Sequence, residues 1–267
     1  MENTMIKKYG GLTSFQLKIL GIILMVFDHI HQMFYMNGIP LWFTGLGRLV
    51  APIFLFLLAE GFYYTRNKKK YMARLWIAYV LMALASNLIQ KAFPLDSVML
   101  MNSIFGTLFL GLYYMYMVDL LKFGIKEKNA KKIVLSVVAM VIPYLISFIL
   151  MFMFFSTSPE NSIFLQAIMV LLPLPLLVEG GTLWIVLAVA FYLLRDKKIW
   201  IRLMPLVLVS ILVFVTGNKL QSLMIFAAIP LAMYNGKPGR KGAKYFFYIF
   251  YPAHIYFLYI ISYVINK

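Results

Sequence analysis

A few ionisable side chains interrupt long apolar segments of this sequence and have the types needed for acid–base chemistry. Asp28 and His29 stand side by side in one apolar segment, Arg48 lies in the next, and His254 lies near the end in YFFYIFYPAHIYF. A charge at such depth in apolar sequence costs several kcal/mol unless it is paired. A histidine can accept and return a proton near neutral pH. These residues therefore predict a buried site that handles protons.

Each residue also has a purely structural interpretation. Asp28 and Arg48 can be a pair that only neutralises itself, and His254 can be a hydrogen-bonded core histidine. His31 is expected near a membrane surface as an interfacial residue. Asp28, His29 and His31 lack the i, i+4 histidine spacing that places two metal ligands on one helix face, although His254 could add a ligand. We therefore predict no metal site.

The composition indicates the kind of fold that must position these residues. Of 267 residues, 63% are hydrophobic and only 13% are charged, whereas a soluble domain has about half apolar and a quarter charged residues. The fold class predicted is all-α, a polytopic helical bundle in a membrane, and residues 1–267 are expected to form a single domain. The lipid bilayer is then a partner along the whole chain.

Apolar segments of membrane-spanning length follow one another, separated by short polar turns. The tight turn Asn37-Gly38-Ile39-Pro40 joins the first two as a helical hairpin. Pro173 and Pro175 break the segment 163–178, which we interpret as re-entrant, giving about nine full crossings, with about ten as the alternative. The expected spans are 14–35, 41–64, 71–91, 100–121, 131–155, 182–194, 200–216, 220–234 and 245–265.

The rise per residue places the ionisable groups at comparable depths. Asp28 and His29 lie about 21 Å above the inner face, and Arg48 and His254 reach a similar level from their own span ends. One shared site in the outer half of the membrane is therefore possible. Glu60 and Arg74 are expected at the cytoplasmic face as an exposed ion pair, a kind of contact worth less than about 1 kcal/mol.

The net charge of +16 is concentrated in short loops. Such clusters mark loops that stay in the cytoplasm, so we predict a cytoplasmic N-terminus and an outer C-terminus. They also attract anionic headgroups or an anionic cofactor, and they argue against nucleic acid as the partner. Of 25 Lys and Arg residues, 21 lie in five groups, namely 7–18, 66–74, 122–132, 195–202 and 237–244.

Five stretches of the sequence, which together cover nearly the whole chain in order, have a family likeness. They are LKILGIILMVFDHI, GRLVAPIFLFLLAEGFYYTRN followed by YMARL, NSIFGTLFLGLYYMYMVD, EGGTLWIVLAVAFYLLRD and YNGKPGRKGAKYFFYIFYPAHIYFLYI. With these segments the sequence resembles the TraX-like proteins, relatives of the membrane enzyme that acetylates the N-terminus of conjugative pilin. One difference is Ser86-Asn87-Leu88-Ile89, where such proteins often have Ser-Glu-x-Pro.

The resemblance implies a transmembrane acyltransferase of the bacterial cytoplasmic membrane. Acetyl-CoA would be the acyl donor, and the acceptor would be an amine or hydroxyl at the outer face, on a protein N-terminus, a glycan or a small molecule. His29 would be the general base, and Asp28 would set its tautomer. His254 would be the rival base or would donate a hydrogen bond to the thioester oxygen. Arg48 would balance the charge of Asp28 or stabilise the oxyanion. The residues expected to bind CoA are Glu60, Arg66, Asn67, Lys68, Lys69, Lys70 and Arg74.

Two other classes of protein fit the same residues. An intramembrane Asp-His-Arg set with broken apolar segments also suits a proton-coupled transporter. A structural scaffold would use the buried charges only as pairs. Binding of acetyl-CoA distinguishes the first class from both alternatives.

Overall fold

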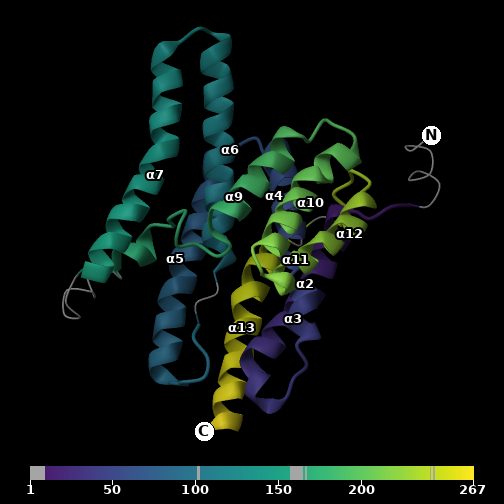
Figure 1. Ribbon diagram of the computed structural model, residues 1–267, viewed down its shortest axis with the longest axis vertical. Coiled ribbons are helices and arrows are strands. Elements are labelled where there is room, and N and C mark those ends of the chain that lie inside the picture. Colours follow the sequence, from purple (N-terminus) through teal and green to yellow (C-terminus); the bar gives the residue numbers. More distant parts are fainter. Residues whose placement is uncertain (1–9, 101–102, 157–164, 166, 241, 243) are drawn as a thin grey trace. The chain divides into compact units, whose positions relative to one another are not determined.

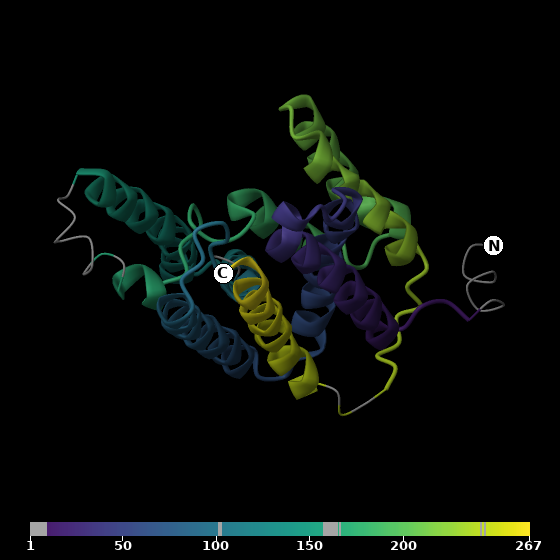
Figure 2. The same ribbon diagram turned by 90° about the horizontal axis from the view of Figure 1, so that it is seen from below.

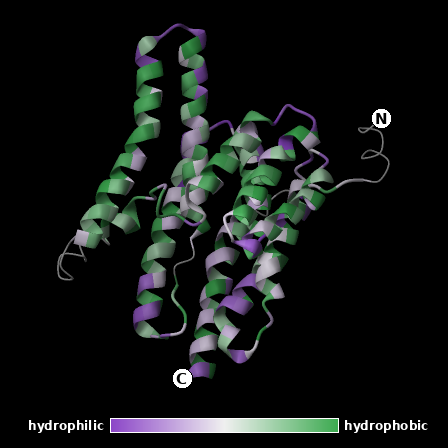
Figure 3. Ribbon diagram, in the orientation of Figure 1, coloured by the Kyte–Doolittle hydropathy of each residue, from purple (hydrophilic) through white to green (hydrophobic). Residues whose placement is uncertain are grey.

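The computed structural model describes residues 10–100, 103–156, 165, 167–240, 242 and 244–267 (Figure 1). Within these ranges the ordered elements are helices, apart from an isolated β-bridge between Leu12 and Tyr234. Most helical residues are apolar, as the hydropathy colouring in Figure 3 shows. The all-α fold class is therefore confirmed. The predicted loop residues Lys7, Lys8 and Lys241 lie outside the described part of the chain.

Six helical segments within the described residues are long and apolar enough to cross a membrane. The second of them consists of two helices that are separated by a short interruption at Arg48. The elements of these segments are α2 (Ser14–Phe34) with the 3-10 helix η1 (Tyr35–Asn37), α3 (Trp42–Gly47) with α4 (Val50–Tyr64), α5 (Lys68–Ala92), α6 (Ile104–Lys126), α7 (Ala130–Ser156) and α13 (Lys244–Asn266).

Shorter apolar helices occupy three of the other expected spans. They are α9 (Gly181–Leu193), α10 (Ile199–Val215) and a run made of α11 (Lys219–Ser222), the 3-10 helix η2 (Leu223–Ala227) and α12 (Ala228–Ala232). A perpendicular crossing needs about 20 residues, and these helices are shorter than that. The six long helices thus match six expected spans, and the count of about nine crossings stays a prediction.

The backbone leaves the helical conformation between α7 and α9, where the sequence predicts a break. Residues 172–180 are not helical, and the amides of Leu177 and Val178 both donate to the carbonyl of Leu174 in a turn. Pro173 and Pro175 lack the amide hydrogens that a helix needs here, so the helix ends before them. α9 begins only at Gly181.

The chain divides into two compact units. The first contains residues 1–57, 86–101 and 193–267, and the second contains residues 58–85 and 102–192. The boundaries fall inside α4 and α5, so each of these helices contributes to both units. The ionisable residues 28, 29, 48 and 254 all belong to the first unit, and the basic residues 66–74 belong to the second.

In the first unit, α2 turns back into α3 at the predicted hairpin. Thr13 and Gln16 form a capping box that starts α2, with the hydroxyl of Thr13 accepting from the amide of Gln16. Gly38 ends η1 with a φ of 81°, a left-handed conformation that glycine adopts without steric cost. The turn therefore forms for the reason that the sequence suggests, and it brings α3 beside α2.

Helix α13 packs along α2 and runs in the same direction (Figures 1 and 2). The contacts advance together along both helices, which is the pattern of parallel packing. They are Phe15 with Phe247, His29 with His254, the Met33 carbonyl with the Ser262 hydroxyl, and Asn37 with Asn266. The first and last long helices of the chain therefore hold the two histidines face to face.

The chain before α2 pairs with the loop before α13. The amide of Leu12 donates to the carbonyl of Met233, and the carbonyl of Leu12 accepts from the amide of Asn235. The amide of Ser14 donates to the carbonyl of Lys237. These backbone bonds fix the starts of α2 and α13 at one end of the first unit. The basic residue Lys237 lies in this loop, so the positive charge gathers at the same end.

In the second unit, α6 and α7 form a second hairpin, which Figure 1 draws in teal. The hydroxyls of Tyr113 and Tyr114 donate to the carbonyls of Ala139 and Met140 at 2.7 and 3.0 Å. A core cluster beside them joins α6 to α9. Its buried members are Leu110, Tyr114, Val178 and Ile185.

Candidate active site

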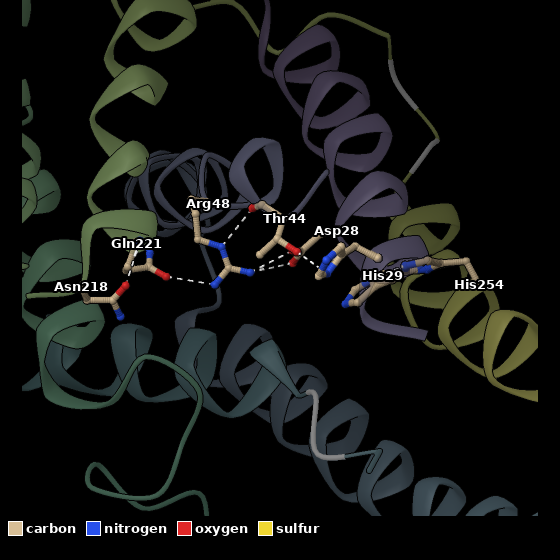
Figure 4. A network of polar contacts seen from close by, with 8 residues as sticks. Asp28, His29, Thr44, Arg48, Asn218, Gln221 and His254 are labelled. Carbon is tan, nitrogen blue, oxygen red and sulfur yellow. Dashed lines mark hydrogen bonds and ion pairs between the residues drawn. The ribbon is translucent and has the colours of Figure 1, made fainter. Parts of the chain in front are cut away.

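Arg48 lies at the interruption between α3 and α4, and all three of its nitrogens donate hydrogen bonds (Figure 4). Nη2 is 2.8 and 3.2 Å from the two carboxylate oxygens of Asp28, and Nη1 is 3.0 Å from Oε1 of Gln221. Nε donates to the carbonyl of Thr44 at 3.2 Å. The guanidinium is thus bound to α2, α3 and α11 at once, and the predicted pairing with Asp28 is present.

Gly47 allows this pair to form. A Cβ atom at position 47 would overlap the carboxyl group of Asp28, because the backbone of α3 approaches that side chain directly. Glycine is the residue that tolerates such a close approach. The Gly47-Arg48 dipeptide therefore works as a unit in which the glycine makes room for the carboxylate and the arginine binds it.

His29 and His254 form a hydrogen-bonded pair. Nδ1 of His29 lies 2.7 Å from Nε2 of His254, and only 4% of His29 and 9% of His254 are exposed. The other ring nitrogen of His254, Nδ1, is 2.8 Å from the carbonyl oxygen of Phe250. Two buried imidazoles at hydrogen-bonding distance have the geometry for passing a proton between them, and the acid–base role of the pair stays a prediction.

Aromatic rings hold the histidine pair from the side of α13. The ring of Phe250 stacks on His254 with centroids 4.9 Å apart and planes at 14°. Tyr251, which is itself buried, lies 6.3 Å from the ring of His29. The aromatic composition of α13 therefore fixes the orientation of one ring and covers the other.

The partner of each ring nitrogen differs in part from the expectation. The sequence suggests that Asp28 orients His29, whereas the carboxylate of Asp28 contacts Arg48 and the Nδ1 atom of His29 contacts His254. Adjacent residues on a helix point about 100° apart, so Asp28 and His29 face different neighbours. His31, expected at an interface, bonds the Thr44 hydroxyl at 2.8 Å through Nδ1.

Gln221 and Asn218 complete the polar network around Arg48 and are missing from the predicted set. The side chain of Asn218 accepts from the amide of Gln221 and so starts α11. The signal in the sequence is the short polar stretch NKLQS between two apolar spans, with the spacing of a helix cap. That spacing predicts a helix start but gives no indication of an arginine partner.

The residues predicted to bind CoA lie at the start of α5, and the structure separates them into two kinds. Arg66, Asn67, Lys69 and Lys70 are exposed, and Asn67 caps the helix by accepting from the amide of Lys70 at 2.8 Å. Lys68 is instead half-buried, with Nζ bonded to Oδ2 of Asp119. The exposed members remain accessible to an anion, whereas Lys68 has an internal partner.

Asp119 is a third residue that is missing from the predicted set. Its Oδ1 accepts from the hydroxyl of Tyr192 at 2.6 Å, and Lys68 lies 4.1 Å above the ring of Phe62, so that α4, α5, α6 and α9 meet here. We name Lys68, Asp119, Tyr192 and Phe62 the Lys68 cluster. An acid at the end of a span, just before a basic loop, was the available signal.

Glu60 does not have the expected exposure. The sequence predicts an exposed Glu60–Arg74 ion pair at the membrane surface, but Glu60 is only 5% exposed, and Arg74 is half-buried. α4 is covered on most faces, since Phe56, Ala59 and Phe62 are fully buried. Glu60 therefore lies inside the protein, and the expectation that it is exposed was wrong.

Among the residues that the structure describes, no three His, Asp or Glu side chains gather closely enough to bind a metal ion. The two buried histidines face each other directly at the distance of a shared proton. The site in the first unit is thus an ion pair beside a histidine pair.

These features define a polytopic helical membrane protein in which an ion pair lies beside a buried histidine pair. The family model described as "TraX protein" matches residues 14–262, which is nearly the whole chain. This protein therefore belongs to the TraX family, which confirms the resemblance seen in the sequence.

A relative from Dichelobacter nodosus agrees with this assignment. The chain is 26% identical over 257 residues to a protein named "Probable fimbrial assembly protein FimC, serogroup H1", covering 91% of this chain and 93% of the relative. No solved structure matches the chain.

Proposed function

We propose that this protein is an integral-membrane acetyltransferase that moves an acetyl group from cytoplasmic acetyl-CoA to an amine or hydroxyl at the outer face. The TraX family is associated with pilin acetylation, and the chain matches that family over residues 14–262. The observation that carries the proposal is the buried pair of His29 and His254, which supplies the proton acceptor that acyl transfer needs.

The reaction requires a proton to leave the acceptor as it attacks the thioester. A nitrogen or oxygen of the acceptor forms a bond to the acetyl carbonyl carbon, and the carbon–sulfur bond of the thioester breaks. The histidine pair takes the proton from the acceptor and returns it to the sulfur of CoA. General acid–base catalysis of this kind is worth roughly 100- to 10,000-fold in rate.

Asp28 and Arg48 support the site electrostatically in this proposal. All three guanidinium nitrogens of Arg48 already donate to Asp28, Gln221 and Thr44. This favours the role of balancing Asp28 over the role of binding the oxyanion, because binding an oxyanion would break one of these bonds. The ion pair keeps a charged network next to the histidines without a net buried charge.

The exposed basic residues at the start of α5 are the proposed site for the phosphates of CoA. Lys69 and Lys70 lie in the first turn of α5, where the helix dipole is positive and lysine is unfavourable. Arg66 adds a third exposed cation in the same loop. An anionic ligand relieves this repulsion, and phosphate groups are the anions that CoA supplies.

The acceptor proposed first is a protein N-terminus. The relative from Dichelobacter nodosus is named as a fimbrial assembly protein, and the family is associated with pilin acetylation. A pilin-like subunit with a free amino terminus is therefore the acceptor to test before glycans and small molecules. A primary amine also needs the loss of a proton during attack, which suits a histidine base.

The test uses the full chain in lipid nanodiscs with acetyl-CoA labelled in the acetyl group. Two peptides of one pilin-like sequence serve as acceptors, one with a free N-terminus and one with that amine blocked. Label should enter only the free peptide, and His29→Gln should lower the rate by roughly 100- to 10,000-fold. Glu127→Gln, a change in an exposed loop pair, is the matched control and should retain the rate.

A second measurement separates binding from transfer. Acetyl-CoA at 100 times its Kd should raise the free energy of unfolding by about 2.7 kcal/mol, and it should do so equally in His29→Gln. Failure of acetyl-CoA to stabilise the protein, together with no transfer to amine or hydroxyl acceptors, would rule out the proposed function. Proton uptake by sealed vesicles under those conditions would instead favour the transporter class.

A further inference from the structure

We infer that His254 is a positioning residue of the pair, and that the carbonyl of Phe250 determines which nitrogen of each ring carries the proton. The inference rests on the proposed function for the reaction but on geometry for the proton order. The starting observation is the chain of three groups, Phe250 carbonyl, His254 and His29, joined by contacts of 2.8 and 2.7 Å.

The first step concerns His254. A carbonyl oxygen can only accept a hydrogen bond, so Nδ1 of His254, 2.8 Å from the carbonyl of Phe250, must carry a proton. In a neutral imidazole the other nitrogen then has the lone pair, which places it on Nε2 of His254. The stacked ring of Phe250 stabilises this orientation of His254, because it leaves the ring little room to turn over.

The second step determines which ring nitrogen of His29 carries the proton. The contact of 2.7 Å between Nε2 of His254 and Nδ1 of His29 needs one proton, and Nε2 of His254 has none to give. Nδ1 of His29 therefore carries the proton and donates it. With both rings neutral, the lone pair of His29 lies on Nε2, which is the atom through which His29 would act as the base of the proposed function.

The same chain excludes His254 as the direct base. Both of its ring nitrogens are engaged, one by the Phe250 carbonyl and the other by His29. It has no lone pair directed at a reacting group in this arrangement. His254 acts through His29, much as the third member of a catalytic triad holds the tautomer and orientation of its histidine.

The proton balance of the reaction follows from this order. Nε2 of His29 takes the proton of the acceptor amine while the amine nitrogen bonds to the acetyl carbon and the carbon–sulfur bond breaks. During this step Nδ1–H of His29 still donates to Nε2 of His254, a charge-assisted bond that stabilises the imidazolium. Nε2 of His29 then gives the proton to the sulfur of CoA, and the pair returns to its starting state.

The direct test is the tautomeric state, which can be read because the chain has only three histidines. The full chain, labelled with 15N-histidine in lipid nanodiscs, would be studied by NMR, with His31→Gln and His254→Gln used to assign the signals. We expect His29 and His254 both to carry the proton on Nδ1. A proton on Nε2 of His29 in the neutral pair would overturn the inference.

Kinetic variants test the roles. His254→Leu removes the acceptor for Nδ1–H and should lower kcat about 10- to 100-fold with unchanged KM for acetyl-CoA, as loss of a partner that orients a histidine does. His254→Gln should restore much of this loss, because its amide oxygen can accept from His29. His31→Gln is the control and should retain full activity. A dead His254→Gln beside an active His29→Gln would reverse the assignment.

The outcomes also separate this inference from the proposed function. If the wild-type protein transfers no acetyl group but both rings carry the proton on Nδ1, the proposed function fails and the proton order is supported. If transfer occurs and His254→Leu leaves both kcat and the His29 tautomer unchanged, the proposed function holds and the positioning role of His254 is overturned.

Discussion

Asp28 and Arg48 form an ion pair whose energetic value can be measured at the scale of single residues. Removal of one partner from a buried pair costs about 3–5 kcal/mol, since the other charge stays buried without compensation. The Arg48 and Asp28 side chains are 28% and 21% exposed, so we expect Asp28→Asn and Arg48→Met each to approach that cost. The double variant should lose clearly less than the sum, measured by unfolding in detergent.

The exposed pair of Glu127 and Lys132 gives the matched control for this cycle. These side chains are 2.7 Å apart but 43% and 34% exposed, and such surface pairs contribute about 0–1 kcal/mol. Their coupling should therefore be small, while Asp28 and Arg48 should couple by at least about 1 kcal/mol. Additive losses for Asp28 and Arg48 would mean that the pair is not formed in the membrane.

Gly47→Ala tests the same site without removing a charge. The added methyl group would occupy the place of the Asp28 carboxyl group, so it should push the carboxylate away from Arg48 and destabilise the protein. Gly45→Ala is the control two residues earlier, where a Cβ meets the flexible end of Leu223 at 3.2 Å. We expect a lower melting temperature for Gly47→Ala than for Gly45→Ala. Equal melting temperatures would contradict the close packing of Gly47.

Some contacts of the site could be inferred from the sequence, and others could not. The depth of Asp28 and Arg48 in apolar segments gave a pair as one interpretation, because an unpaired charge there is costly, and left a contact of Arg48 with the oxyanion as the alternative. The partner of His29 was not predictable, since 225 residues separate it from His254 and spacing along the chain does not indicate helix pairing. Which helices pack together depends on the complementarity of whole surfaces.

At the scale of elements, we expect substitutions of neighbouring lysines at the start of α5 to have different effects. Lys68→Gln removes the ion pair with Asp119 and should lower the stability of the protein, with little effect on acetyl-CoA affinity. Lys69→Gln with Lys70→Gln should weaken acetyl-CoA binding in a salt-dependent way, because exposed charges are strongly screened by ions. Both effects can be measured by titrating acetyl-CoA while following thermal unfolding at two ionic strengths.

Asp119→Asn is the companion variant for this comparison. It removes the same ion pair from the side of α6 and leaves every lysine of α5 in place. We expect its stability loss to resemble that of Lys68→Gln. A salt-dependent loss of acetyl-CoA affinity in Lys68→Gln but not in Asp119→Asn would show that Lys68 itself binds phosphate.

The elements themselves were largely predictable. Long apolar segments bounded by basic turns fix where the six long helices lie, and Pro173 and Pro175 fix the break before α9. The division of the second segment into α3 and α4 was not predicted, because its apolar pattern continues across Arg48. The local signals for it are Gly45, Gly47 and Pro52, since the proline has no amide hydrogen to bond the carbonyl of Arg48.

At the scale of the whole molecule, the parallel packing of α2 and α13 bears on topology. Successive spans alternate in direction, so parallel first and last spans require an odd number of crossings. This supports about nine crossings over about ten, and it agrees with the predicted orientation in which the two ends of the chain lie on opposite faces. The basic loop at Lys237 lies at the start of both helices, the end predicted to be cytoplasmic.

Single cysteines test that orientation directly, because the native chain contains no cysteine. In intact cells an impermeant maleimide should label cysteines at Met36 and Lys267 but not at Lys69, Lys128 or Lys197. The expected difference follows from the basic loops, which stay in the cytoplasm. Permeabilised cells, in which all positions should react, provide the control. Labelling of position 197 in intact cells would contradict the re-entrant interpretation of residues 163–178.

The contact between α2 and α13 can form only late in the biosynthesis of the chain. His29 leaves the ribosome early, and its partner follows 225 residues later, which takes roughly 10–45 s at a translation rate of 5–20 residues per second. Asp28 and Arg48, only 20 residues apart, can pair as soon as the first hairpin is inserted. The nascent chain therefore neutralises its charges first and acquires its complete histidine pair only when the last helix enters the membrane. A polypeptide that ends before α13 retains both partners of the Asp28–Arg48 pair but lacks the partner of His29.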